Sequence, residues 1–84
     1  MAGPTLAPEH SVHRYGARDY TVMFDGASTW QVFDEDRYLG LIRRTPGNGP
    51  VRYEGRAAGE EHIEPLATTD DWRAVLLFLA VANA

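Results

Sequence analysis

The 84-residue chain contains no cysteine and no lysine, and it has no long apolar segment. Because cysteine is absent, neither a disulfide bond nor a thiolate metal site can stabilise the fold. The most apolar stretch, residues 75–82, is far shorter than the roughly 18 residues that a membrane-spanning helix requires. These absences exclude a disulfide-stapled scaffold and argue against a membrane helix.

The absence of lysine means that all eight basic side chains are arginines, which are planar and permanently charged. Twelve acidic residues outnumber them, and the net charge of −4 disfavours non-specific attraction to nucleic acids and to anionic membranes. The N-terminal residues show neither the basic start nor the apolar core of a signal peptide. We therefore expect a cytoplasmic protein with no membrane partner.

The length of the chain predicts one domain, and an apolar content of 44% is typical of a folded protein. Two prolines and the lack of any hydrophobic period predict a flexible, disordered tail over residues 1–14. The single domain is then expected over residues 15–84 and belongs to the α+β class. Residues 11–15 offer an alternative, because they could add an edge strand.

Alternating apolar and polar residues predict an antiparallel meander of three to four strands. The segments that show this period of two are residues 19–24, 29–33, 38–44 and 51–57. Asp25-Gly26 is a strong turn signal between the first two of them. Gly40, in the middle of the third, indicates that another backbone or a large ring approaches closely there.

A C-terminal helix is predicted to begin at Thr68 or Thr69, where Thr68 and Asp71 resemble a capping box. We expect this helix to pack across one face of the sheet. Residues that share one side of the helix form its expected core stripe: Trp72, Val75, Leu76 and Leu79.

The other side of this helix is also apolar, and we call it the helix flank; its residues are Ala74, Leu77, Phe78 and Val81. Apolar side chains at those positions are expected to be shielded from water by other protein atoms. Either a further strand or the N-terminal segment covers them, or a protein partner does. A second copy of the chain is the simplest partner, because a two-fold interface requires only one patch.

Four arginines form a candidate nucleic-acid face: Arg43, Arg44, Arg52 and Arg56. If the third and fourth strands pair, these side chains gather on one side of the sheet, where guanidinium groups can bind phosphates or bases. The interleaved Glu54 and the negative net charge favour a plain solvated face instead. Nucleic-acid binding is therefore the alternative function.

Residues suited to catalysis or metal binding are few. His10 and His13 are spaced as a metal pair, but zinc sites usually need four ligands and cysteine is absent. Acidic residues surround His62, yet a surface loop offers no pocket to shift a pKa; they are Glu60, Glu61 and Glu64. We expect no enzymatic activity, no cofactor and no metal.

The segment Leu66-Ala67-Thr68-Thr69-Asp70-Asp71-Trp72, which opens the helix, resembles the AP2-like arm-binding domains of tyrosine-type phage integrases. The resemblance covers about residues 30–82 and implies a three-stranded sheet with one helix. This chain has Trp72 where that family has alanine, and its strands lack the family's basic character. The resemblance therefore implies architecture more than DNA binding.

Together these features predict a non-catalytic protein-interaction or regulatory module that contacts its partner, or a second copy, through the helix flank or an edge strand.

Overall fold

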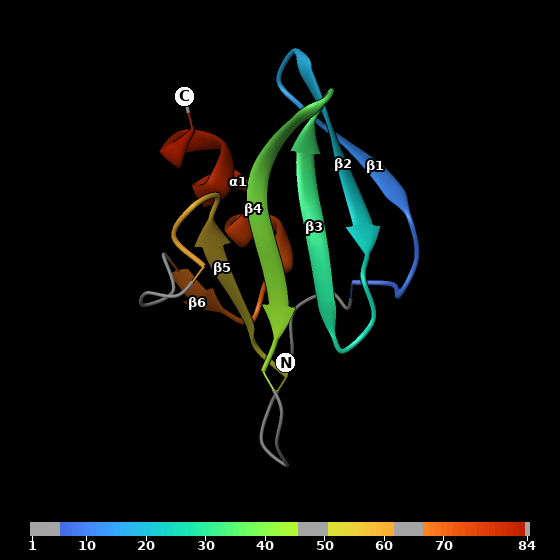
Figure 1. Cartoon of the computed structure of the whole chain (residues 1–84), viewed down its shortest axis with the longest axis vertical. Coiled ribbons are helices and arrows are strands. Elements are labelled where there is room, and N and C mark those ends of the chain that lie inside the picture. The colour runs from blue at the N-terminus through green and yellow to red at the C-terminus, as the bar shows by residue number, and fades with distance from the viewer. Residues whose placement is uncertain (1–5, 46–50, 62–66, 84) are drawn as a thin grey trace.

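The computed structural model describes residues 6–45, 51–61 and 67–83, and these form one antiparallel sheet and one helix (Figure 1). The strands are β1 (Ser11–Tyr15), β2 (Arg18–Phe24), β3 (Thr29–Asp34), β4 (Arg37–Arg44), β5 (Tyr53–Ala57) and β6 (Ala67–Thr69), and the helix is α1 (Trp72–Ala82). The strands are ordered in space as in the chain, so that each strand pairs with its sequence neighbour. The predicted α+β class and antiparallel meander are therefore confirmed.

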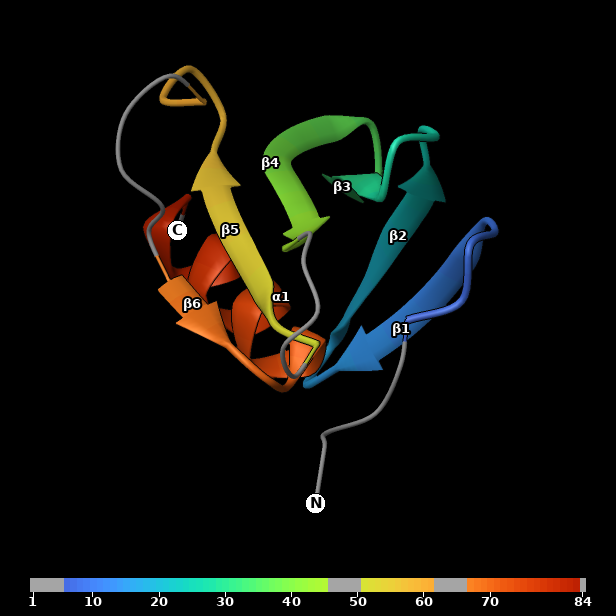
Figure 2. The ribbon, with the colours of Figure 1, turned by 90° about the horizontal axis from the view of Figure 1, so that it is seen from below.

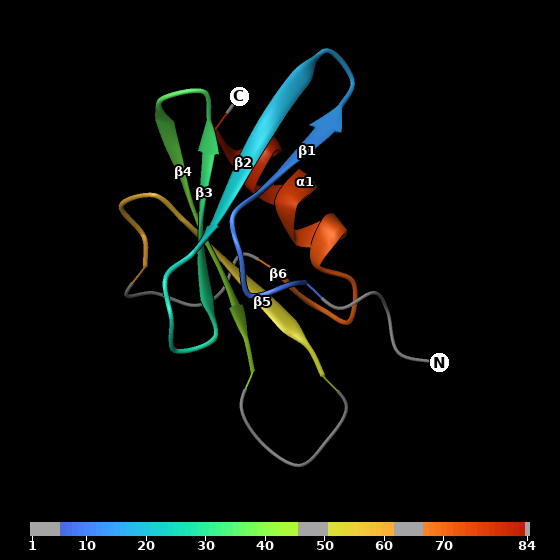
Figure 3. The ribbon, with the colours of Figure 1, turned by 90° about the vertical axis from the view of Figure 1, so that its right-hand side faces the viewer.

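The sheet curls into an open half-barrel, and α1 lies inside the curl (Figure 2). The first residue of the helix, Trp72, contacts His13 of β1, and the helix packs against β4, β5 and β6. Gly55 on β5 permits this close approach, since a Cβ atom there would lie 2.5 Å from a methyl group of Val75. Figure 3 shows that the C-terminal end of α1 lies at the same end of the molecule as the β1–β2 and β3–β4 turns.

A bulge in β4 accounts for the burial of two consecutive residues. Val32 pairs with Gly40 and Phe33 pairs with Tyr38, so Leu39 is an extra residue in the register. Strict alternation would place Leu39 on the outer face, but the bulge turns its side chain into the core, where it is 2% exposed. Gly40 has φ +140°, and a Cβ atom there would collide with the Arg56 carbonyl oxygen. The predicted close backbone approach at Gly40 is thus confirmed.

The N-terminal segment differs from the sequence prediction of a tail over residues 1–14. Leu6 is 3% exposed and its backbone N–H donates to the hydroxyl of Tyr53 at 3.0 Å. The indole Nε1 of Trp30 donates to the Ala7 carbonyl oxygen at 2.8 Å. Residues 11–15 form β1, as in the edge-strand alternative, so only residues 1–5 of the predicted tail lie outside the described part of the chain.

The sheet has six strands rather than three to four, because β1 and β6 add one at each edge. Thr68 and Thr69 are β-branched residues that belong to β6, where they pair with β5. The helix therefore does not begin at either of them. Asp71 is the N-cap instead, and its Oδ1 accepts from the backbone N–H of Arg73 at 3.0 Å. The predicted capping box is therefore wrong.

Among the residues that the structure describes, no helix is long and apolar enough to cross a membrane.

Candidate binding surfaces beside the C-terminal helix

The inner side of α1 is sealed against the sheet. Trp72 is 6% exposed, and Val75, Leu76 and Leu79 are completely buried. These residues contact the inward-facing side chains of the strands in one continuous core. The core stripe predicted from helical spacing is confirmed.

The helix flank faces away from this core. Leu77, Phe78 and Val81 are 44%, 52% and 75% exposed, and with the half-buried Ala74 they line a shallow groove of about 300 Å³. The described N-terminal residues do not cover it, because Leu6 lies at the other end of the core against Tyr53. The described part of the chain thus leaves three large apolar side chains of one helix in contact with solvent.

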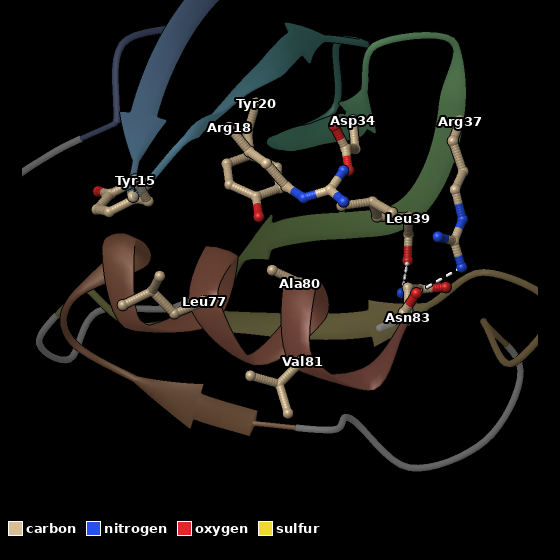
Figure 4. Close-up of a pocket in the computed structure, with 11 residues that line it drawn as sticks. Tyr15, Arg18, Tyr20, Asp34, Arg37, Leu39, Leu77, Ala80, Val81 and Asn83 are labelled. Atoms are coloured by element: carbon tan, nitrogen blue, oxygen red, sulfur yellow. Dashed lines mark hydrogen bonds and ion pairs between the residues drawn. The ribbon is translucent and has the colours of Figure 1, made fainter.

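A deeper cleft of about 540 Å³ lies beside the flank, between the last turns of α1 and the β1–β2 and β3–β4 turns (Figure 4). Its apolar wall consists of Leu39 from β4 and Leu77, Ala80 and Val81 from α1. Because Leu77 and Val81 belong to both surfaces, the cleft and the helix flank are continuous.

The polar wall of the cleft follows from the strand register. Tyr20 pairs with Asp34, and Asp34 pairs with Arg37, so these three residues form one row across β2, β3 and β4. Cross-strand partners point to the same face of a sheet, and Tyr20 is part of the core, so the row faces inward. Arg18 lies two residues before Tyr20 and shares its face. The last inward positions before the turns are therefore polar.

Charges in the cleft are partly compensated. Arg18 Nη1 lies 2.7 Å from Asp34 Oδ2, and Arg37 donates to the carbonyl oxygen of Asn83 at the helix end. The side-chain amide of Asn83 donates through Nδ2 to the carbonyl oxygens of Leu39 and Leu79 at 2.9 and 2.8 Å, which connects the last helical turn to β4. Two guanidinium groups and one carboxylate leave the cleft with one net positive charge.

The tyrosine hydroxyl groups divide between structural and free positions. The Tyr53 hydroxyl accepts from Leu6, and the Tyr38 hydroxyl donates to Glu61 at 3.4 Å. Tyr20 is only 7% exposed, yet its hydroxyl opens into the cleft and has no hydrogen-bond partner among the described residues (Figure 4). Tyr15 lines one end of the cleft, and burial raises the pKa of its hydroxyl.

The four arginines of the candidate nucleic-acid face do not gather on one side. Glu54 on the outer face forms ion pairs with Arg43 at 3.8 Å and with Arg56 at 3.4 Å. Arg52 donates to the Thr68 carbonyl oxygen at 3.4 Å. Arg44 pairs in register with Tyr53, which faces the core, and so leaves the sheet on the other side. A carboxylate thus sits between the arginines of this face.

The histidines do not form the pair that their spacing indicates. The His13 ring packs against Trp72 with centroids 4.6 Å apart, and burial lowers the pKa of His13. His10 is exposed, whereas His62 and Glu64 lie outside the described residues. The part of the chain that the structure describes contains no cluster of three or more His, Asp or Glu side chains able to hold a metal.

The sequence analysis missed the cleft, although a signal for it is present. Arg18 and Asp34 occupy core-facing positions of alternating strands but are charged, which is unusual for inward positions. Arg37 carries no such signal, because the bulge at Leu39 shifts the alternation of β4.

Comparison with protein-family models, curated proteins and solved structures finds no match to this chain. The resemblance to AP2-like integrase domains stays a prediction.

Proposed function

We propose that the protein is a non-catalytic protein-interaction or regulatory module whose contact surface is the helix flank. The observation that carries this proposal is the exposure of Leu77, Phe78 and Val81 on a helix whose other side is fully buried. Aromatic and aliphatic side chains of this kind are typical of the buried centre of an interface. The flank is also free of charged residues, and charges are depleted at such centres.

The size of the flank favours self-association as the simplest arrangement. Burying one Leu, Phe or Val side chain contributes about 1.5–3 kcal/mol, whereas association costs at least about 4 kcal/mol. In a two-fold dimer each copy contributes the same patch, so the apolar gain is doubled. A stable interface buries about 800 Å² per partner, so the contact extends from the flank onto neighbouring surface.

Substitution of Leu77 or Val81 by Glu tests the proposal. If the flank mediates self-association, light scattering at increasing protein concentration gives a dimer mass for the wild type and a monomer mass for Leu77→Glu. The matched control is Val12→Glu, because Val12 is 58% exposed on β1 and belongs to neither the flank nor the cleft. Circular dichroism checks that all variants remain folded.

Two results contradict self-association. One is a wild type that stays monomeric at the highest concentration, and the other is an equal loss of mass in Val12→Glu and Leu77→Glu.

A further inference from the structure

The Tyr20 hydroxyl lines a cleft and has no hydrogen-bond partner among the described residues. The Tyr20 ring is held in the core, and the residue is 7% exposed. In Figure 4 its hydroxyl points toward α1, near Ala80. A tyrosine hydroxyl both donates and accepts one or more hydrogen bonds, so this position is suited to a polar group of a ligand.

The arginines on the polar wall retain most of their donors. Each guanidinium carries five N–H groups. Arg18 makes a hydrogen bond to Asp34 through Nη1, and Arg37 makes one to the Asn83 carbonyl oxygen through Nη2. Both side chains line the cleft and come from different turns, so their remaining donors are available to a ligand that lies between them.

Charge limits the ligand to a monoanion. The cleft has one net positive charge from Arg18, Arg37 and Asp34, in a protein whose net charge is −4. The carbonyl groups at the end of α1 add a partial negative charge of about 0.5. With the helix end included, a carboxylate with one charge leaves only about −0.5 in the cleft, whereas a phosphate dianion would leave about −1.5 next to Asp34.

The apolar wall of the cleft favours a ligand that carries an apolar group beside its carboxylate. The apolar residues that line the cleft are Leu39 from β4 and Leu77, Ala80 and Val81 from α1. The volume of about 540 Å³ lies within the range of small-ligand sites, about 300–1,000 Å³.

We propose that the cleft binds a carboxylate carried on a compact apolar body. Arg18 and Arg37 donate to the carboxylate oxygens, the Tyr20 hydroxyl donates a further hydrogen bond, and the apolar body packs on Leu77 and Val81. The carboxylate belongs either to a free small acid or to the C-terminal residue of a peptide. This site does not depend on the proposed function, but a bound ligand covers two residues of the helix flank and so changes the surface that a partner meets.

Titration of the ¹⁵N-labelled full chain tests the site with defined probes. Phenylacetate and the dipeptide acetyl-Leu-Phe with a free C-terminus are each compared with their amides, which have the same apolar body without the charge. We expect saturable shifts of the amide signals of Arg18, Leu39 and Ala80 with the acids and at least about tenfold weaker binding of the amides, because hydrogen bonds to charged groups are the stronger ones. Tighter binding of phenylacetate indicates a free acid as the ligand, and tighter binding of the dipeptide indicates a peptide C-terminus.

Variants locate the binding. Tyr20→Phe removes only the hydroxyl and is expected to weaken phenylacetate binding about two- to tenfold, in line with the loss of one hydrogen bond. Arg37→Gln is expected to weaken it about tenfold or more. Arg44→Gln is the matched control, since Arg44 is an exposed arginine at the other end of β4, and its affinity is expected to stay within about twofold of wild type.

Three outcomes overturn the proposal. The first is the absence of saturable shifts with both acids up to their solubility limits. The second is binding of an amide or of inorganic phosphate as tightly as phenylacetate. The third is unchanged affinity in Tyr20→Phe and Arg37→Gln, or an equal loss in Arg44→Gln. Tyr20→Phe leaves the helix flank intact, so the dimer mass measured by light scattering reports on the proposed function separately.

Discussion

Tyr53 and Tyr20 lie at opposite ends of the same concave face, and they are 1% and 7% exposed. At the Tyr53 end, the N-terminal segment folds over the core, and the backbone of Leu6 donates to the tyrosine hydroxyl. At the Tyr20 end, the described residues provide no partner for the hydroxyl, and a cleft remains. One end of the half-barrel is therefore closed by the chain itself, and the other presents unused polar groups beside exposed apolar ones.

A buried residue therefore need not serve only the stability of the fold. Tyr53 completes a hydrogen bond that joins residues 47 positions apart in the chain. The ring of Tyr20 also packs in the core, but its hydroxyl lies at the cleft and has no hydrogen-bond partner among the described residues. The contrast between a closed end and an open end can be tested by paired substitutions.

The largest effect is expected from Leu6→Ala at the closed end. Removal of a buried leucine side chain leaves a cavity and should lower the free energy of unfolding by about 2–5 kcal/mol. The matched variant at the open end is Leu77→Ala, for which we expect a change of about 0.5 kcal/mol or less at protein concentrations where the chain is monomeric, because Leu77 is 44% exposed. Urea denaturation followed by circular dichroism measures both. Equal losses would remove the distinction between the two ends.

An intermediate effect is expected from deleting each tyrosine hydroxyl. Tyr53→Phe leaves the buried N–H of Leu6 without an acceptor and should cost about 1–3 kcal/mol. Tyr20→Phe removes no intramolecular hydrogen bond among the described residues, so its free energy of unfolding should stay within about 0.5 kcal/mol of wild type. Thermal and urea denaturation of both variants provide the measurement, and a larger loss in Tyr20→Phe would contradict the assignment of its hydroxyl to the cleft.

The smallest effect is expected from the titration of His13, which packs on Trp72. Burial lowers the pKa of His13 below its ordinary value of 6.5, so the unfolded chain binds more protons than the folded one as the pH falls. The stability from neutral His13 is thus fully present above about pH 6.5 and is lost as the pH falls through the lowered pKa.

Melting temperatures measured between about pH 7.5 and pH 5 should reveal this loss, since histidine is the side chain that ordinarily titrates there. His13→Phe keeps an aromatic contact with Trp72 and should flatten the profile, whereas the control His10→Gln should not, because His10 is exposed. A profile that is identical in wild type and His13→Phe would exclude His13 as its source.

Local signals predicted those parts of the fold that depend on neighbouring residues. The period of 3.6 identified the core stripe of α1, and the period of two with Asp25-Gly26 identified the β2–β3 hairpin. Gly40 indicates a close approach because glycine has no Cβ atom, and the Arg56 carbonyl oxygen lies where such an atom would be.

Long-range pairing explains the parts that local signals missed. β1 alternates too weakly to be more than an alternative in the sequence, and it forms because β2 offers it a free edge. Leu6 lies in a segment with two prolines and no hydrophobic period, and its role depends on Tyr53 far along the chain. The cleft requires the register of three strands and the bulge at Leu39, none of which can be read from one segment.

The order of the strands has a consequence for how the chain reaches this structure. Every strand pair joins elements that are adjacent in the sequence, so each closes only a short loop. Folding can therefore advance hairpin by hairpin without a long search for distant partners, which is typical of rapidly folding small domains. Two contacts lie outside this sequence of local steps: the docking of α1 in the curl and the return of Leu6 to Tyr53. We expect these two closures to come late and to convert a curled sheet into a single cooperative unit.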